Sequence, residues 1–328
     1  MNGREENNIK NEAKTMKMIA DYPLLQEYYF SKDENSAKGK FIYCGHIINY
    51  FKYLTENGID IFKIDSFKRI KMIDINKYMA SIRYYTDKNG NKKQAAASSR
   101  NVKLAAIRSF YNFLVKAGYI QNNPCDNVEN PKIKIEKEIV YLEKDEIEKI
   151  KEEIDADTSY QYLEWMKVRD KLIITLDCRT GLRKTALSEI NISDIDFDNN
   201  KILVTEKGNI TREVYFGEDT KKLIIEWLSY REKVMKDSDC DALFISKRKN
   251  RISTVTIDQM IVKYSSKIGK RISSHKMRAT CATNLYEQTH DIYIVKDVLG
   301  HKNVANTQRY ANVSEKKKKQ AAAILDEL

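Results

Sequence analysis

The chain has 328 residues, which is enough for two domains that each bury a hydrophobic core. A hydrophobic fraction of 42% excludes an intrinsically disordered protein, and the sequence has no apolar run long enough to cross a membrane. The net charge of +11 favours a polyanionic partner. The polar N-terminus lacks the apolar core of a signal peptide, and five scattered cysteines fit a reducing compartment. We therefore expect a soluble, cytoplasmic protein.

The first 125 residues predict an all-α domain. Ser36 is placed to cap a helix that ends near Glu56, and a shorter helix is expected over residues 76–85. Ser99 is predicted to cap a third helix, which Gly118 closes. Its apolar face would hold Val102, Ala106, Phe110, Phe113 and Leu114.

Basic residues gather in this first part of the chain. Residues 1–140 hold 24 basic and 16 acidic side chains, and the stretch from Lys88 to Cys125 carries seven cations without a carboxylate. A charge run is commonly a solvated face, but the absence of counter-charges favours a surface that follows DNA phosphates. A helix with one packed and one basic face suits the major groove. The candidate DNA contacts are Lys92, Lys93, Arg100, Lys103 and Arg108.

A linker is expected over residues 126–140, where two Asn-Pro pairs border a polar stretch. The second domain, residues 141–328, opens on an acidic helix start. An apolar helix over 168–178 is predicted to lead into a turn at Gly181, and Arg183 is predicted to begin the next helix. A β-hairpin follows, with strands at 201–205 and 211–216, and the pattern is helical from Thr220 onward. The second domain is thus expected to be mixed α/β, mostly helical, with a small antiparallel sheet.

Six residues of the second domain could break and rejoin a phosphodiester without a metal. Arg183 and Arg278 offer guanidinium forks for the phosphate oxygens. Tyr310 offers a phenol nucleophile, which needs a base or cations because phenols ionise near pH 10. Two histidines could move protons and a lysine at the hairpin tip could protonate the leaving 5′-oxygen; these are His275, His301 and Lys207.

Each of these residues alone is a weak signal. An isolated arginine is usually a surface residue, and the chain has 20 tyrosines, most of which must serve packing. The histidines and cysteines show no metal-ligand spacing, so neither a metal nor another cofactor is expected.

The motifs in their order resemble the tyrosine recombinases of the integrase and Xer type, over nearly the whole chain. They are Thr180-Gly181-Leu182-Arg183, His275-x-x-Arg278, Leu299-Gly300-His301 and Tyr310, with Lys207 in a Lys-Gly hairpin. The resemblance implies a four-helix, SAM-like core-binding domain and a catalytic domain that close around double-stranded DNA. It also implies strand exchange by a homotetramer on two DNA sites, through a 3′-phosphotyrosyl bond and without ATP.

The resemblance further implies that a last helix, residues 314–328, packs on a neighbouring protomer. Its docking face would be Ala321, Ala322, Ile324 and Leu325. Few residues precede the first predicted helix, so we expect a member without an arm-binding domain. The resemblance does not separate integration or excision of a mobile element from resolution of DNA dimers.

Two positions depart from the family pattern. The family often has an acidic residue three positions after the first arginine, where this chain has Ala186. The residue after the second arginine is often histidine, where this chain has Ala279. Both departures bear on how firmly Arg183 and His275 are held.

Two other functions remain open from the sequence. A type IB topoisomerase-like enzyme would use the same chemistry as a monomer, but the predicted C-terminal helix favours assembly. A DNA-binding protein that has lost catalysis is disfavoured because all six candidate catalytic residues are present.

Overall fold

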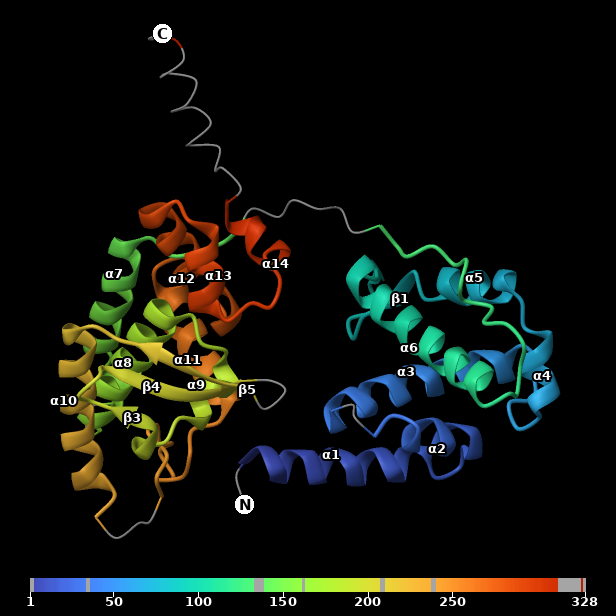
Figure 1. Ribbon diagram of the computed structural model, residues 1–328, viewed down its shortest axis with the longest axis horizontal. Helices are drawn as coiled ribbons and strands as arrows, with labels where there is room; N and C mark the ends of the chain where they lie inside the picture. The colour runs from blue at the N-terminus through green and yellow to red at the C-terminus, as the bar shows by residue number, and fades with distance from the viewer. Residues whose placement is uncertain are drawn as a thin grey trace. The chain divides into compact units, whose positions relative to one another are not determined.

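The computed structural model describes residues 3–33, 36–132, 139–160, 163–206, 210–236, 240–311 and 326. The chain divides into two compact units, Met1–Glu136 and Lys137–Leu328 (Figure 1). Within the described ranges, no helix is long and apolar enough to span a membrane. Lys207 and the predicted docking face Ala321, Ala322, Ile324 and Leu325 lie outside the described residues, as does most of the expected helix over 314–328.

The first unit consists of helices and one small hairpin. Its helices are α1 (Gly3–Ile19), α2 (Pro23–Phe30), α3 (Ala37–Glu56), α4 (Ile64–Arg69), α5 (Met72–Ser81) and α6 (Ala97–Lys116). Strands β1 (Tyr84–Thr86) and β2 (Lys92–Gln94) pair antiparallel. Helix α3 packs against both α1 and α6. Edge-to-face and tilted contacts among Phe51, Phe67 and Phe110 fill the centre of this unit.

The start of α3 confirms the cap predicted at Ser36, whose hydroxyl accepts a hydrogen bond from the Gly39 amide. Gly118 also ends α6 as predicted, with a positive φ of +74°. The cap predicted at Ser99 is wrong, because α6 already begins at Ala97. Ser99 lies in the first turn of the helix, and the N-cap position is Ala96, which makes no side-chain cap hydrogen bond.

The helix predicted over residues 76–85 is also displaced. Helix α5 begins at Met72, because the Asp74 carboxylate accepts a hydrogen bond from the Lys71 amide at its start. It ends at Ser81, and the next residues form β1. The Asp87 carboxylate accepts from the amides of Asn89 and Asn91, which closes the turn between β1 and β2. This local turn chemistry overrides the helical periodicity.

The second unit combines helices with one three-stranded antiparallel sheet in the order β3-β4-β5 (Figure 1). The strands are β3 (Ile195–Asp196), β4 (Lys201–Glu206) and β5 (Ile210–Tyr215). The helices are α7 (Lys144–Asp155), α8 (Glu164–Thr180), α9 (Lys184–Glu189), α10 (Glu218–Val234), α11 (Thr254–Lys267), α12 (Ser274–Thr289), α13 (Ile292–Leu299) and α14 (Ala305–Gln308). Short 3₁₀ turns lie at Thr158–Tyr160, Ile192–Asp194 and Arg309–Ala311. The predicted mixed α/β, mostly helical class of this unit is confirmed.

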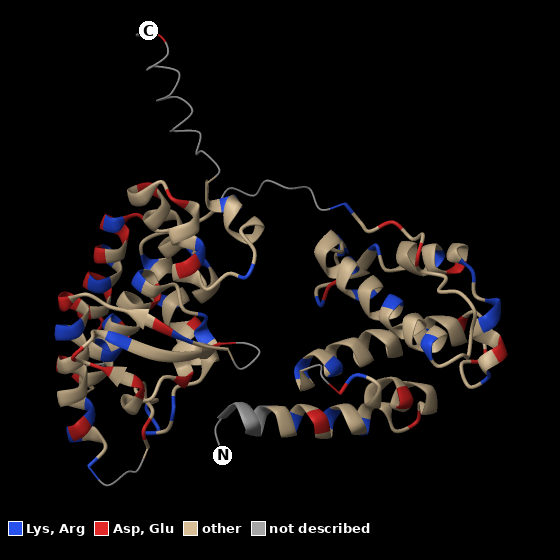
Figure 2. Cartoon of the chain, viewed as in Figure 1, with Lys and Arg blue, Asp and Glu red and all other residues tan. Residues whose placement is uncertain are grey.

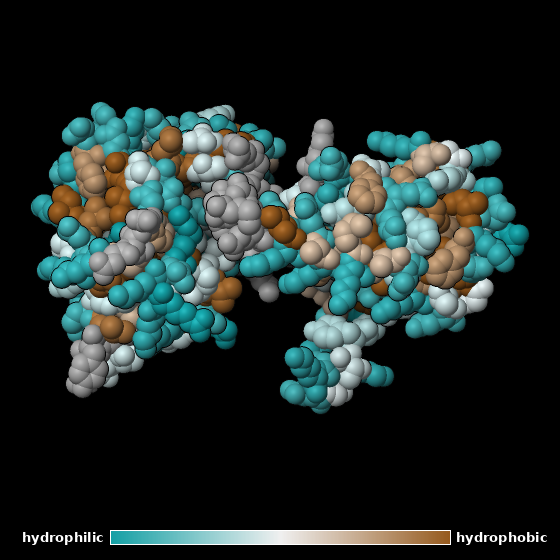
Figure 3. Space-filling model, turned by 90° about the horizontal axis from the view of Figure 1, so that it is seen from below, coloured by the Kyte–Doolittle hydropathy of each residue, from teal (hydrophilic) through white to brown (hydrophobic). Residues whose placement is uncertain are grey.

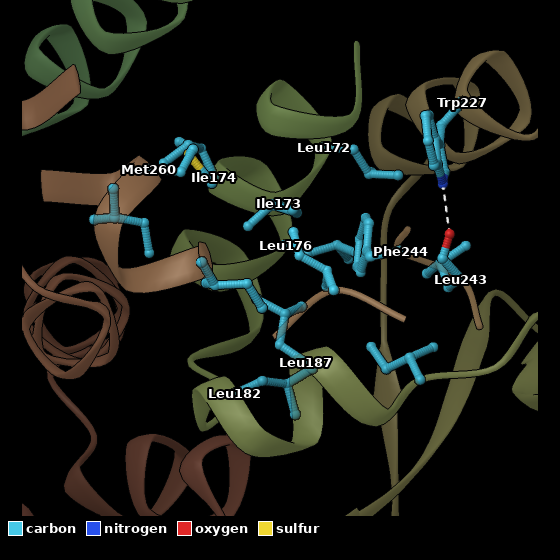
Figure 4. Close-up of a cluster of buried hydrophobic side chains, with 14 of the residues drawn as sticks. Leu172, Ile173, Ile174, Leu176, Leu182, Leu187, Trp227, Leu243, Phe244 and Met260 are labelled. Atoms are coloured by element: carbon cyan, nitrogen blue, oxygen red, sulfur yellow. Dashed lines mark hydrogen bonds between the residues drawn. The ribbon is translucent and has the colours of Figure 1, made fainter. Parts of the chain in front are cut away.

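Helix α8 lies at the centre of the second unit, with α7, α10 and α12 packed against it. Leu172 and Leu176 of α8 belong to the same buried cluster as Phe244 (Figure 4). In this cluster the Trp227 indole donates a 2.9 Å hydrogen bond to the Leu243 carbonyl. The packed core fixes the end of α8, from which the chain turns at Gly181 toward α9.

Charges are distributed differently on individual helices. Helix α6 carries Arg100, Lys103, Arg108 and Lys116 and no acidic residue, whereas α7 and α10 carry both signs (Figure 2). In the view of Figure 3, hydrophobic residues form separate patches among hydrophilic ones on each unit. The uncompensated charge of α6 is the feature that distinguishes it electrostatically from the helices of the second unit.

Candidate active site

The buried side chain of Arg278 connects two loops of the second unit. Arg278 lies on α12 and is 3% exposed. Its Nη1 donates a 2.6 Å hydrogen bond to the Gly181 carbonyl, and its Nη2 donates to the Leu299 carbonyl. The loop before Arg183 and the loop before His301 are therefore held by the same guanidinium.

Both loops turn on a glycine with positive φ, +58° at Gly181 and +63° at Gly300. A methyl group added at Gly181 would lie 2.6 Å from Leu299 Cδ2 and 3.2 Å from Cys281 Cβ. The left-handed conformation and this close approach both require glycine. The two glycines thus allow the ends of α8 and α13 to come together.

Arg183 lies at the start of α9, where the sequence predicted a helix beginning. Its backbone is extended at the N-cap position, and its side chain is 40% exposed. Arg183 Nη1 forms an ion pair with the carboxylate of Glu206, the last residue of β4. Partial burial and then the nearby charge of Arg212 lower the pKa of Arg183. Arg183 stays charged because guanidinium groups do not lose their proton in proteins.

The two candidate histidines lie close to these arginines. Desolvation and the charges of Arg278, Arg183 and Arg309 lower the pKa of His301 to about 4. Its Nδ1 is 2.9 Å from the hydroxyl oxygen of Thr307. His275, in the first turn of α12, also has a lowered pKa, for which desolvation is the first cause and Arg309 the second. Both imidazoles are therefore mostly neutral at pH 7 in the absence of an anion.

Tyr310 lies in the 3₁₀ turn after α14 and is 4% exposed. The neighbouring Arg309 donates a 2.6 Å hydrogen bond from Nη2 to the phenol oxygen, and its guanidinium carbon lies 4.8 Å from the centre of the Tyr310 ring. Arg278 lies near enough for the charges of the two groups to interact. Two guanidiniums, those of Arg309 and Arg278, thus lie near the phenol.

The structure brings five of the six predicted catalytic residues together: Arg183, His275, Arg278, His301 and Tyr310. The sixth, Lys207, lies outside the described residues and follows Glu206 directly in the sequence. Among the described residues, no group of three or more acidic, histidine or cysteine side chains could hold a metal ion.

The predicted DNA contacts all lie in the first unit. Lys92 and Lys93 are exposed on β2, where Lys93 pairs with Asp87 at 2.7 Å. Arg100 and Lys103 lie partly buried on α6. Arg108 differs from the others, because its Nη2 donates to the carbonyls of Cys125 and Val128. Its guanidinium fastens the segment after α6, so it is less available to a phosphate than the prediction assumed.

Four residues of the site were not identified from the sequence: Glu206, Arg212, Thr307 and Arg309. Arg309 could have been noticed as a cation next to the candidate nucleophile. Thr307 lies six residues after His301, a spacing that carries no general signal. Glu206 and Arg212 reach the site through the pairing of β4 with β5, and nothing in the local sequence around Arg183 points to either of them.

Comparison with known proteins agrees with this geometry. Residues 140–317 match the Phage integrase family, and residues 24–118 match the N-terminal SAM-like domain of phage integrases. The tyrosine recombinase XerC of Caldanaerobacter subterraneus subsp. tengcongensis is 34% identical, over 95% of this chain and 89% of that protein.

Two solved structures share the fold. One is a XerH site-specific recombinase bound to palindromic difH substrate, with a TM-score of 0.71 and 20% identity over 92% of this chain and 84% of that one. The other is the Tn1549 transposon integrase in complex with transposon right end DNA, with a TM-score of 0.68 and 18% identity over 93% and 98%. Because a family model matches residues 140–317 and the XerC relative is 34% identical over most of the chain, the chain belongs to the phage integrase family of site-specific tyrosine recombinases, enzymes that cleave and rejoin DNA strands.

Proposed function

We propose that Tyr310 is the nucleophile of strand cleavage and that Arg183 and Arg278 bind the scissile phosphate. The observation that carries this proposal is the convergence of these two guanidiniums, both candidate imidazoles and the phenol. Arg278 binds the loops that lead to Arg183 and His301, and the charges of these groups act on one another and on His275. Guanidinium groups stabilise the charge that the non-bridging phosphate oxygens gain in the transition state.

In the proposed reaction, the phenol oxygen of Tyr310 attacks phosphorus and forms a 3′-phosphotyrosyl bond. The bond from phosphorus to the 5′-oxygen breaks, and a proton from Lys207 is proposed to complete the leaving 5′-hydroxyl. The phenol proton passes to a neutral imidazole. His301 is the candidate acceptor because it is neutral at pH 7 and its contact with Thr307 leaves Nε2 for the reacting groups. The negative phosphate of bound DNA would raise its low pKa and so strengthen it as a base. The incoming 5′-hydroxyl reverses these steps.

Arg309 has a supporting role in the proposed chemistry. Its hydrogen bond to the Tyr310 oxygen stabilises the negative charge that develops there as the proton leaves. Cationic donors around the phenol thus take the place of the metal ion that many phosphodiester-cleaving enzymes use.

We also propose a role for each domain and for the assembly of the protein. Residues 1–125 would bind the DNA site, residues 126–140 would link the two domains, and residues 141–328 would cleave. The active assembly would be a homotetramer on two double-stranded DNA sites, located in the cytoplasm. A lambda integrase that shares this fold was solved as a tetramer bound to a Holliday junction. The biological reaction would be integration or excision of a mobile element, or resolution of DNA dimers.

Covalent capture tests the proposed nucleophile. The protein is mixed in EDTA with a library of nicked duplexes that trap the cleaved strand, and DNA that stays attached after SDS is sequenced. Wild-type protein is expected to retain a defined set of duplexes, and Tyr310→Phe is expected to retain none while still binding them. Tyr286→Phe serves as the matched control, because Tyr286 packs in the same hydrophobic cluster. Capture by the Tyr310→Phe variant would exclude Tyr310 as the nucleophile.

A further inference from the structure

The anionic partner of the Arg183 guanidinium does not come from its own helix, α9. Residue 186, one helical turn further along α9, is an alanine that is 3% exposed. The structure supplies a carboxylate from another element. Glu206 ends β4, its side chain is 6% exposed, and it forms an ion pair with Arg183 Nη1.

A second arginine holds the same carboxylate. Arg212 on β5 approaches Glu206 Oε1 with Nε at 3.0 Å and Nη2 at 2.9 Å, whereas Arg183 contacts Oε2. Each carboxylate oxygen therefore has its own guanidinium. A buried carboxylate with two charge-assisted partners has little freedom to rotate, so the position of Arg183 follows that of the β4-β5 hairpin.

Arg212 also connects this ion-pair cluster to the end of α13. Its Nη1 donates a 3.1 Å hydrogen bond to the Val298 carbonyl near the end of α13. A methyl group added at Gly300 would lie 2.9 Å from Arg212 Nε. The Arg183–Glu206–Arg212 cluster thus connects α9 through the hairpin to the loop that carries His301.

The positive charges of the neighbouring arginines explain why a carboxylate is favourable at position 206. Burial and then the charges of Arg183 and Arg212 lower the pKa of Arg278, so the three guanidiniums lie close enough to repel one another. Glu206 is the negative group between two of them. Without it, Arg183 would move toward solvent, since 40% of its side chain is already exposed. The same exposure leaves part of the guanidinium accessible to a phosphate.

We propose that Glu206 is a positioning residue for Arg183 and supplies from β4 the carboxylate that α9 lacks at Ala186. This inference rests on the proposed role of Arg183 in binding the scissile phosphate. Glu206 itself would not contact the DNA. Its effect on cleavage would act through Arg183, and its place directly before Lys207 would make the position of Arg183 depend on the hairpin that carries this lysine.

Single-turnover cleavage of a captured duplex tests the inference. Glu206→Gln keeps the shape of the side chain and removes its charge, and it is expected to slow formation of the covalent complex by roughly tenfold to a hundredfold, as for other residues that orient a catalytic group. Glu213→Gln is the matched control, because Glu213 is a carboxylate on β5 that pairs with Lys201 and is 42% exposed. Equal rates for the two variants would overturn the proposal.

A double-mutant cycle separates positioning from general structural damage. If Glu206 acts through Arg183, its replacement should cost much less in an Arg183→Lys background than in the wild type. Additive losses in the two backgrounds would mean that Glu206 serves the fold and not Arg183. Thermal unfolding of each variant is measured alongside.

A spectroscopic measurement on the protein without DNA does not depend on cleavage. The Arg183 guanidinium signals, assigned in ¹⁵N spectra by their loss in Arg183→Lys, are expected to show hindered rotation about the Nε–Cζ bond in the wild type. A freely rotating Arg183 guanidinium in the wild type would contradict the proposed anchor, even if Glu206→Gln failed to fold. Absence of any covalent complex from wild-type protein would instead count against the proposed nucleophile and leave this measurement valid.

Discussion

Burial and then the charges of neighbouring arginines lower the pKa of both histidines in this site. His301 is surrounded by Arg278, Arg183, Arg309 and Arg212, each of which disfavours a second positive charge nearby. The folded chain therefore keeps His301 neutral down to about pH 4, whereas an ordinary histidine is half-protonated at pH 6.5. Between these values the unfolded chain binds a proton that the folded chain does not. The stability that His301 contributes is present above pH 6.5 and is lost as the pH falls through about 4.

Replacing Arg309 by glutamine should raise the pKa of both histidines. Arg309 lowers the pKa of His275 and of His301, so its loss should move both titrations upward toward the ordinary value. The titrations can be followed by NMR of the imidazole carbons. Arg248→Gln, at an exposed loop position, is the control and should leave both unchanged. A pKa of His301 that stays near 4 in Arg309→Gln would show that burial and the other arginines set it without Arg309.

The same substitution should slow DNA cleavage. Removing the Nη2 donor leaves the developing charge on the Tyr310 oxygen with one charge-assisted hydrogen bond fewer, and such bonds contribute about 1.5–3 kcal/mol. A loss of roughly tenfold or more in the single-turnover rate is therefore expected, with DNA binding little changed. An unaltered rate would limit Arg309 to packing on the Tyr310 ring.

At the scale of elements, the loops that carry Arg183 and His301 depend on the ends of helices. Helices α8 and α13 both end at a glycine in the left-handed conformation, Gly181 and Gly300. Arg278 of α12 then joins the two ends through carbonyl oxygens. A small shift in the position of these helix ends would displace Arg183 and His301 together, because each follows its glycine within a few residues.

Gly181→Ala should destabilise the second unit and reduce cleavage. The added methyl group would meet Leu299 Cδ2 at 2.6 Å, and φ of +58° is unfavourable for alanine, so a loss of about 1–3 kcal/mol is expected. Both tryptophans, Trp165 and Trp227, are buried in this unit, so their fluorescence during urea unfolding reports on it directly. Gly217→Ala is the control, since its added methyl group has no neighbour within 4 Å. Equal midpoints for the two variants would refute the close packing of Gly181.

The elements also show what the sequence can and cannot predict. Helix α3 and the hairpin strands β4 and β5 were predicted because capping and alternation are local signals. Helix α5 and the start of α6 were misplaced, since a turn around Asp87 and an uncapped start at Ala97 outweigh periodicity. The candidate catalytic residues were proposed from the order of their motifs. The ion-pair partner of Arg183 could not be predicted from the sequence, because Glu206 lies on a strand that only the fold brings beside α9.

Across the whole molecule, basic charge is distributed unevenly between the two parts of the sequence. Residues 1–140 carry 24 basic and 16 acidic side chains, whereas 141–328 carry 34 and 31. In the second unit many lysines are paired, as in Lys184 with Asp258 and Lys270 with Glu146. Helix α6 has no acidic residue, and the charge of Lys103 reaches His46 on α3, whose pKa is lowered by burial and then by this lysine. Long-range attraction of DNA should therefore come mainly from the first unit.

Lys103→Ala should weaken DNA binding without changing the chemical step. If Lys103 neutralises a phosphate, its loss should reduce the slope of log K against log salt by about one, because one counterion fewer is released. Lys68→Ala is the matched control, since the Lys68 ammonium on α4 already pairs with Asp65 at 2.7 Å. Binding is measured by fluorescence anisotropy over a series of salt concentrations, on the duplex recovered by covalent capture. A slope equal to that of the control would place Lys103 away from the phosphates, and the basic face of α6 would then serve solubility and not DNA recognition.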